Sequence, residues 1–327
     1  MPVAGLSLLT LNIGNPSPDR ARRQLAWLIR RDEDILVLTE TKASAGCLLL
    51  AEELTAAGYA VHYPRPGAGE YGTMIVSTVP ATPDDGFGDR VGYLPSRAAA
   101  VILPAPAGAL RVIGLYVPAR DASPGKTERK RKWLAACDAA LAAAVTEMPT
   151  ILLGDLNVVE PDHWPRYPFF APFEYDFYRA LAGPHRLTDV FRRLHPDEAE
   201  HSWVGRAGDG YRYDHAFCCQ SLSGYITDCD YLHQPREDGL TDHSALRMRL
   251  AIIPPAAPLP LCPHDAPGVP ASELEHPADD GSPRADDGLL PRSQRSPGGV
   301  EDDGGCPAVQ EVRLVQVDDD PVWLYVR

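Results

Sequence analysis

Two polar side chains follow a short apolar run near the middle of the chain. Residues 151–153 are Ile, Leu and Leu, Gly154 interrupts the run, and Asp155 and Asn157 come directly after it. Side chains two residues apart leave the same face of an extended backbone, so this carboxylate and this amide could act on one object. They could bind a metal ion, a water molecule or phosphate oxygens. Glycine, aspartate and asparagine in this order are equally typical of a turn, and the motif alone leaves both interpretations open.

Other predicted strands also end in polar side chains. Asn12 ends an apolar strand predicted over residues 3–12, and Glu40 follows a strand predicted over residues 35–38. Tyr116 stands at the end of a third predicted strand, beside a proline. These three residues therefore share with Asp155 a position at the end of a strand.

In the later part of the chain the order is reversed, because polar groups lie in or before the strands. Asp214 falls within a strand predicted over residues 211–218, and His243 precedes a strand predicted over residues 244–253. If these strands run antiparallel to the earlier ones, they begin at the edge where the earlier ones end. The sequence then predicts a single cleft lined by Asn12, Glu40, Tyr116, Asp155, Asn157, Asp214 and His243.

Helices are predicted between these strands. One is capped by Ser17, a second covers residues 47–57, and an alanine-rich third covers residues 133–145. The densest basic cluster, residues 126–132, lies at the start of the third helix and could be a solvated face or a binding patch. Further strands are predicted over residues 59–63, 72–79, 98–103, 201–204 and 225–228.

Composition indicates a globular protein with an acidic C-terminal part. The 327 residues are 44% hydrophobic, and the net charge is −14. Residues 254–327 hold 14 of the 45 acidic residues and only 5 of the 31 basic ones, so the body is close to neutral. We expect no membrane span, no secretory signal and a cytoplasmic location, with the 7 cysteines reduced.

The motifs together resemble the endonuclease/exonuclease/phosphatase superfamily, and within it the exonuclease III type of DNA repair nuclease. Its motifs appear in the family's order over residues 5–250. They are Thr10-Leu11-Asn12, Thr39-Glu40-Thr41-Lys42, Tyr116-Val117-Pro118, Gly154-Asp155-Leu156-Asn157, Ser202-Trp203, Gly210-Tyr211-Arg212-Tyr213-Asp214-His215 and Thr241-Asp242-His243-Ser244. Two departures are Ala119-Arg120, which lacks the usual glycine, and Asp214-His215 in place of the commoner Asp-Tyr.

This resemblance implies an α/β four-layer sandwich, with two mixed β-sheets face to face and helices outside. It also implies a site that uses Mg²⁺ or Mn²⁺. Glu40, Asn12 and Asp242 would bind the metal, Asp155 would activate water with help from Asn157, and Asp214, His243 and Tyr116 would assist. Trp203, Arg212 and Lys42 would contact substrate; Arg212 and Lys42 could instead orient carboxylates, and Trp203 could be a core residue.

The resemblance implies a catalytic domain over residues 1–253. Composition predicts a disordered Pro/Gly/Asp-rich linker over 254–307, and apolar runs with partial alternation predict a C-terminal β-hairpin within 308–327. The first expectation is a monomeric nuclease that cuts DNA at abasic sites or trims 3′ ends. A phosphatase or phosphodiesterase acting on a small phosphate ester is the second, and a binding module without catalysis is the third.

Overall fold

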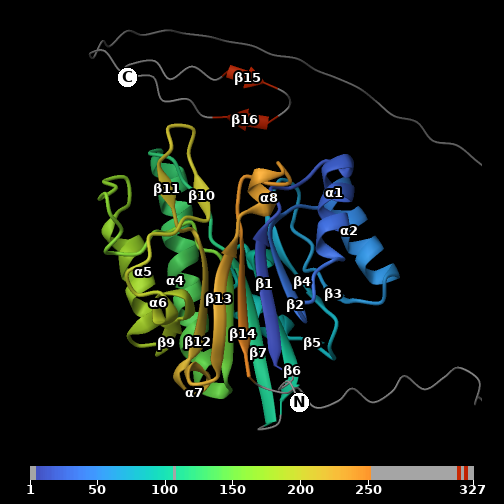
Figure 1. Cartoon of the computed structure of the whole chain (residues 1–327). Helices are drawn as coiled ribbons and strands as arrows, with labels where there is room; N and C mark the ends of the chain where they lie inside the picture. Colours follow the sequence, from blue (N-terminus) through green and yellow to red (C-terminus); the bar gives the residue numbers. More distant parts are fainter. Residues whose placement is uncertain (1–4, 106–107, 252–314, 318–319, 323–327) are drawn as a thin grey trace, which may run out of the picture. The chain divides into compact units, whose positions relative to one another are not determined.

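The computed structural model describes residues 5–105, 108–251, 315–317 and 320–322 (Figure 1). Residues up to 251 that are described belong to one compact unit, Met1–Leu261. Within a separate unit, Cys262–Arg327, strands β15 (Val315–Val317) and β16 (Asp320–Val322) pair antiparallel. The predicted linker at 254–307 lies outside the described residues, so the division into domains stays a prediction.

Two six-stranded mixed sheets form the centre of the first unit. The first has the order β13 (Ile226–Leu232), β14 (Ala245–Leu250), β1 (Leu6–Asn12), β2 (Ile35–Thr41), β4 (Gly72–Ser77) and β3 (Ala60–His62). The second has the order β5 (Thr82–Pro83), β6 (Ala98–Ala105), β7 (Gly108–Tyr116), β8 (Thr150–Asp155), β12 (Asp214–Cys219) and β9 (Leu187–Asp189). Pairs β1–β2 and β7–β8 are parallel and the other pairs are antiparallel, so both sheets are mixed.

The sheets pack face to face because their strands are apolar on both sides. Leu8 of β1 and Leu153 of β8 lie in the core between the sheets, whereas the neighbouring Leu9 packs on the helices outside the first sheet. Leu152 packs in the same way outside the second sheet. This explains the continuous apolar runs of the sequence, since alternate side chains enter two different cores.

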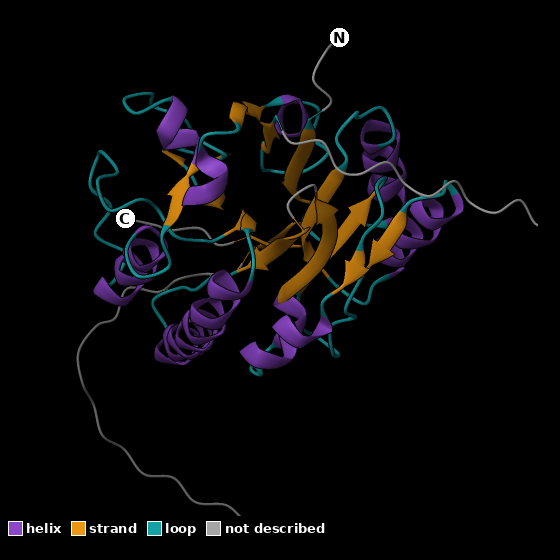
Figure 2. Ribbon diagram, turned by 90° about the horizontal axis from the view of Figure 1, so that it is seen from below, coloured by secondary structure: helices purple, strands orange, loops and turns teal. Residues whose placement is uncertain are grey.

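Helices complete the four layers on the two outer faces (Figures 1 and 2). Helices α1 (Pro18–Leu28) and α2 (Ala45–Ala56) cover the first sheet, and α4 (Pro124–Glu147) and α5 (Pro172–Ala182) cover the second. Shorter helices are α3 (Asp85–Val91), η1 (Pro95–Arg97), α6 (Val190–Leu194), α7 (Gln220–Ser223) and α8 (Gln234–Glu237). The α/β sandwich predicted from the sequence is confirmed.

One predicted strand is wrong in a way that matters for the site. Residues 211–218 form two elements: β11 (Gly210–Tyr211) pairs with β10 (Trp203–Val204) in a separate hairpin, and β12 begins only at Asp214. The chain leaves the hairpin at Arg212 and Tyr213 and enters the second sheet. Asp214 is therefore the first residue of a central strand and lies directly opposite Asp155.

Candidate active site

The strand directions bring the predicted polar residues to one edge of the sandwich. Parallel strands β7 and β8 place Tyr116 beside Asp155, and antiparallel β12 places Asp214 on the other side of Asp155. In the first sheet, β1 ends at Asn12 next to β2, and antiparallel β14 starts just after His243. The inference that later strands begin where earlier strands end is thus confirmed.

Asn12 joins the two sheets across this edge. Its side-chain nitrogen donates to Glu40 Oε2 and to Asp155 Oδ2, both at 2.9 Å, and lies 3.4 Å from His243 Nε2. The two carboxylate oxygens are therefore separated by no more than two hydrogen-bond lengths. Its Oδ1 accepts from the backbone N–H of Gly14 at 2.9 Å. In this orientation Asn12 holds the two carboxylates together as a donor, and its role as a metal ligand stays a prediction.

Asp155 and Asn157 form a turn and a site at once. The backbone N–H of Asn157 donates to Asp155 Oδ1 at 2.8 Å, and Asn157 has a left-handed φ of 47°. The side chain of Asn157 donates to Asp155 Oδ2 at 3.2 Å and to the carbonyl of Val117 at 3.0 Å. The sequence interpretation assumed an extended backbone, but the chain turns here. The turn itself orients the Asp155 carboxylate.

Gly154 is required for this geometry and does not end the strand. Strand β8 continues through Gly154 to Asp155, and Gly154 has φ of 146°. A Cβ atom at this position would lie 2.0 Å from the carbonyl oxygen of Leu115. Glycine therefore lets β7 approach closely, which brings Tyr116 next to Asp155.

His243 and Asp214 form a buried pair beside Asp155. His243 Nδ1 lies 2.7 Å from Asp214 Oδ2, and the backbone N–H of Asp214 donates to Ser202 Oγ at 3.0 Å. Burial lowers the pKa of His243, but the charge of Asp214 and its hydrogen bond outweigh burial and raise that pKa. The imidazole is therefore held protonated, with Nε2 facing the other polar groups.

Carboxylates dominate this edge, which makes it suited to a cation. In the described part of the chain the hydrogen-bond partners of Glu40, Asp155 and Asp214 are amides, a hydroxyl and an imidazole, with no lysine or arginine among them. Burial and the nearby charge of Asp214 raise the pKa of Asp155. Asp214 Oδ1 is buried without a hydrogen-bond partner. Hard divalent cations prefer such oxygen donors, so the residues fit Mg²⁺ or Mn²⁺.

Two placements of the cation are compatible with the donors. Asp155, Asp214 and His243 each offer a ligand atom, and these atoms lie within 4.8 Å of one another. His243 already uses Nδ1 for Asp214, however, and would have to release the proton on Nε2 to bind a cation, which its raised pKa opposes. Glu40, which is partly exposed and within reach of Asp155, is the better anchor.

Tyr116 lies beneath this edge as a neutral phenol. It is 4% exposed, and burial together with the charges of Glu40 and Asp155 raises its pKa well above the ordinary value. The guanidinium of Arg97 lies 4.8 Å from its ring centre, and the ring of Tyr71 packs edge-on at 5.7 Å. Tyr116 can therefore donate a hydrogen bond at any moderate pH.

The predicted substrate contacts separate into two groups. Trp203 is half-buried at the rim of this edge, and its backbone forms an isolated antiparallel β-bridge with His243. Its Nε1 donates to Asp242 Oδ2 at 2.9 Å. Asp242 is thus held by an indole at the rim, and this contact does not place it among the Glu40 and Asp155 carboxylates. Lys42 Nζ lies 4.1 Å from the ring centre of Tyr71 and remains a candidate for substrate contact.

Arg212 cannot contact substrate. It is 1% exposed, and its guanidinium forms ion pairs with Glu160 at 2.9 Å and Asp189 at 2.7 Å. The predicted substrate contact is wrong, whereas the alternative role of orienting carboxylates is what its position provides. Arg212 thus belongs to an interior network with Glu160 and Asp189, whereas Asp214, two residues later, belongs to the site.

Lys130 is a residue of the site region that sequence reasoning missed. It belongs to the basic cluster at the start of α4 but is 1% exposed. Its Nζ donates to the carbonyl of Asn157 at 2.7 Å and lies 2.6 Å from the buried carboxylate of Glu174. The available signal was helical spacing: Lys130 lies one turn before the buried Leu134 and two turns before the buried Cys137, on the same face of α4.

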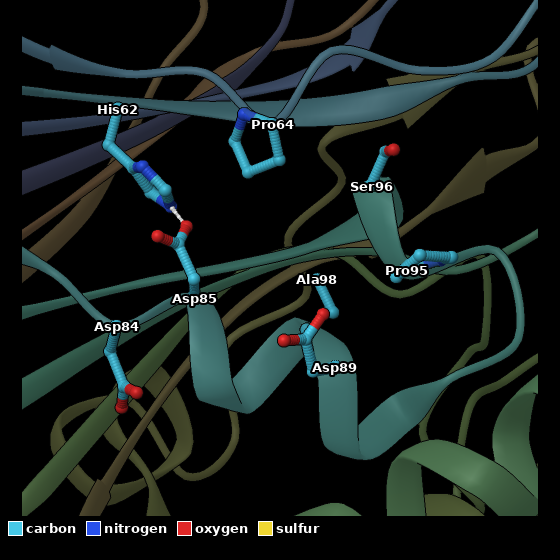
Figure 3. Close-up of a pocket in the computed structure, with 9 residues that line it drawn as sticks. His62, Pro64, Asp84, Asp85, Asp89, Pro95, Ser96 and Ala98 are labelled. Atoms are coloured by element: carbon cyan, nitrogen blue, oxygen red, sulfur yellow. Dashed lines mark ion pairs between the residues drawn. The ribbon is translucent and has the colours of Figure 1, made fainter.

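A cavity of about 240 Å³ lies away from these residues (Figure 3). It is lined by His62, Asp84 and Asp85, among others. Asp85 pairs with His62 at 3.8 Å, and Asp84 with Arg111 at 2.7 Å. Only Asp84 has a cationic partner here, because burial lowers the pKa of His62. The carboxylate-rich edge, where polar groups from both sheets meet, is the better candidate for chemistry.

A comparison with known protein families covers the part of the chain that carries these side chains. The model of the Endonuclease/Exonuclease/phosphatase family matches residues 9–243, which include all the side chains gathered at this edge. The chain belongs to the endonuclease/exonuclease/phosphatase family. Enzymes of this family are generally dependent on divalent metals, and membership identifies the chain as a phosphoesterase hydrolase. No curated protein sequence matches it.

Solved structures of this family share the fold. An AP endonuclease from Archaeoglobus fulgidus is 25% identical, with a TM-score of 0.63. A 3′ phosphatase from Neisseria bound to a product DNA hairpin is 23% identical with a TM-score of 0.63, and a 3′-5′ exonuclease from Neisseria meningitidis is 22% identical with a TM-score of 0.61. Each comparison covers 75% of this chain and 99% of the other. None of the helices in the described ranges is long and apolar enough to cross a membrane.

Proposed function

We propose that this protein is a Mg²⁺- or Mn²⁺-dependent DNA phosphodiesterase that cuts at abasic sites or removes nucleotides and phosphates from 3′ ends. The observation that carries the proposal is the bridge by Asn12, which holds Glu40 and Asp155 together beside the His243–Asp214 pair. The DNA-acting enzymes of the same fold support DNA as the substrate. Monomeric state and cytoplasmic location remain predictions.

Each side chain then has a role that follows from its contacts. Asp155, aimed by the N–H of Asn157, accepts the proton of the attacking water. Protonated His243 donates to the phosphate oxygens as negative charge develops on them, and Asp214 keeps its ring oriented. Tyr116 adds a neutral donor. A divalent ion bound through Glu40 would supply neutralisation of the phosphate and leaving-group charge.

A substrate screen tests the proposal. Duplexes with an abasic site, a recessed 3′ end or a 3′ phosphate are incubated with Mg²⁺, with and without chelator, and Glu40→Ala serves as the blank. We expect metal-dependent cleavage of at least one duplex by the parent and none by the blank. Absence of cleavage of all three duplexes would refute the DNA activity.

A small phosphate ester is the second candidate substrate, and the charge balance favours it. Without the acidic residues 254–327, the body holds 26 basic and 31 acidic residues, which does not favour binding to a polyanion. Salt dependence separates the candidates, because a protein that contacts several phosphates loses affinity steeply as salt rises. Flat dependence with rapid turnover of soluble esters would support the second candidate.

A further inference from the structure

Trp164 is exposed to an unusual degree for its residue type. Its side chain is 84% exposed, whereas Trp27 and Trp133 are 7% and 0% exposed and Trp203 is half-buried. Trp164 lies in the segment between β8 and α5, which follows directly from Asp155 and Asn157. A single exposed apolar side chain needs no explanation by itself, so the neighbouring rings decide its meaning.

The residues on either side of Trp164 belong to a cluster of aromatic rings. His163 stacks on Tyr211 with ring centres 5.4 Å apart, and Tyr167 lies 5.0 Å from the same ring. Tyr211 also stacks on Tyr213, with centres 5.4 Å apart and an angle of 12° between the planes. The segment that carries Trp164 is thus held to the β10–β11 hairpin by ring contacts.

The same cluster reaches the catalytic edge. The ring of Trp203 lies 5.9 Å from Tyr211 and 6.0 Å from Tyr213. Its Nε1 donates to Asp242, the residue before His243, and its backbone bridges to His243 itself. Ring contacts therefore run from Trp203, which joins His243 only through the backbone, to Tyr211 and on to His163, the residue that precedes Trp164.

The charges of this surface favour stacking over phosphate binding. Exposed Asp162 and Asp209 offset exposed Arg166 and Arg206, so the segment and the hairpin present no excess of positive charge. An indole face binds any nucleobase through its π-surface, independently of base identity. Paired bases are stacked within the duplex, and only an unpaired base has a face free for such contact.

We propose that Trp164 is a stacking site for an unpaired nucleobase of the substrate strand, held next to the β10–β11 hairpin by the contact between the rings of His163 and Tyr211. This inference rests on the proposed function, because it names the substrate class of the same site. It selects DNA with a single-stranded or displaced nucleotide near the scissile phosphate. Base identity has no influence on this contact.

Binding of matched oligomers tests the inference without requiring cleavage. Labelled oligothymidylate and an abasic oligomer of equal length and charge are titrated with the full chain in chelator, and anisotropy reports the Kd. We expect the parent to bind the base-bearing oligomer about 10-fold more tightly, since this change lies within the range for one base stacked on one aromatic side chain. Trp164→Ala should lose the preference, and Trp164→Phe should keep most of it.

The matched control is Tyr225→Ala. Tyr225 is 52% exposed and lies between α7 and β13. Helix α7 follows the end of β12 that is far from Asp214 (Figure 1). This variant should retain the preference of the parent. The inference is overturned if Trp164→Ala keeps the preference, or if the parent binds both oligomers equally or neither.

Cleavage in Mg²⁺ is scored separately on the same preparations. A parent that prefers bases through Trp164 but cleaves no duplex would refute the proposed function and leave the stacking site intact. A parent that cleaves duplexes while Trp164→Ala shows an unchanged base preference would refute the stacking site alone.

Discussion

Two clusters of buried carboxylates lie close together in the chain but differ in their partners. At the candidate active-site edge, Asp214 pairs with the imidazole of His243, and the charge of that imidazole also acts on Asp155. In the interior network, Glu160 and Asp189 contact Arg212, and Glu160 also pairs with Arg192 at 2.6 Å. Asp155, Asp214 and Asp189 lie at strand ends and Glu160 lies in the segment after β8, yet only the second cluster has a guanidinium for each carboxylate.

The difference in partners reverses the direction of the pKa shifts. Burial alone would raise the pKa of Glu160, but hydrogen bonds from Arg192 and Arg212 and the charge of Arg212 lower it to about 2. Burial raises the pKa of Asp155, and the charge of Asp214 raises it further. The network has a guanidinium for each carboxylate, whereas the edge has only the imidazole of His243 for its carboxylates. This difference supports the proposal that the edge receives a cation and a phosphate, while the network stabilises the entry into β12.

The largest expected effect is the loss of activity in Asp155→Asn. The variant keeps the shape of the side chain but removes the base, so we expect kcat to fall about 10³-fold. Removal of one crowded negative charge should leave the Tm unchanged or higher. Steady-state hydrolysis and thermal unfolding measure both quantities, and a variant that keeps full activity would refute the assignment of the base.

Arg212→Met should affect stability instead. It leaves Glu160 and Asp189 buried without their shared guanidinium, which costs about 3–5 kcal/mol of the free energy of unfolding. The matched control is Arg22→Met, because Arg22 pairs with Asp19 on the surface and should cost less than about 1 kcal/mol. Urea unfolding compares them, and equal costs would contradict the comparison.

Acid should weaken the interior network in a defined pH range. The pKa of Glu160 is depressed from 4.5 to about 2, so its stabilisation is complete above pH 4.5 and is lost as the pH falls toward 2. This shift corresponds to roughly 3 kcal/mol. Urea midpoints measured between pH 6 and pH 3 should fall more steeply for the parent than for Arg212→Met. Parallel slopes would show that the network does not carry this dependence.

Lys130→Met should produce the smallest change, because Lys130 acts on the site through the backbone of Asn157. Loss of its hydrogen bond loosens the turn that aims Asp155, and we expect kcat to fall about 10-fold, the value of a single hydrogen bond from a charged group. KM should stay constant. Lys132→Met, an exposed residue of the same helix, is the control and should leave kcat unchanged. A change in KM alone would indicate substrate contact instead.

The fold and the gathering of the site could be read from the sequence for a simple reason. Apolar runs such as residues 151–153 identify strands buried on both faces, and polar groups at their ends fall at one edge once the directions are fixed. The later strands had to be antiparallel for Asp214 and His243 to join Asp155, and the polar groups preceding those strands indicated this order.

Other features depend on contacts that no local pattern records. Arg212 and Lys130 are buried because carboxylates far away in the chain, Glu160 and Glu174, meet them in the fold. The break between β11 and β12 also depends on these distant contacts, because Arg212 turns inward to Glu160 and Asp189. The sequence does not show the break, since aromatic residues lie on both sides of Arg212. The left-handed turn at Asn157 could be suspected from its residue type but not located.

The position of a bound cation tests the central claim most directly. Crystals of the protein soaked in Mn²⁺ would give an anomalous peak at the metal. We predict a peak in contact with the Glu40 carboxylate, close to Asp155 and absent in Glu40→Ala. A peak held only by Asp155, Asp214 and His243, or none at millimolar Mn²⁺, would contradict the claim that Glu40 anchors the cation.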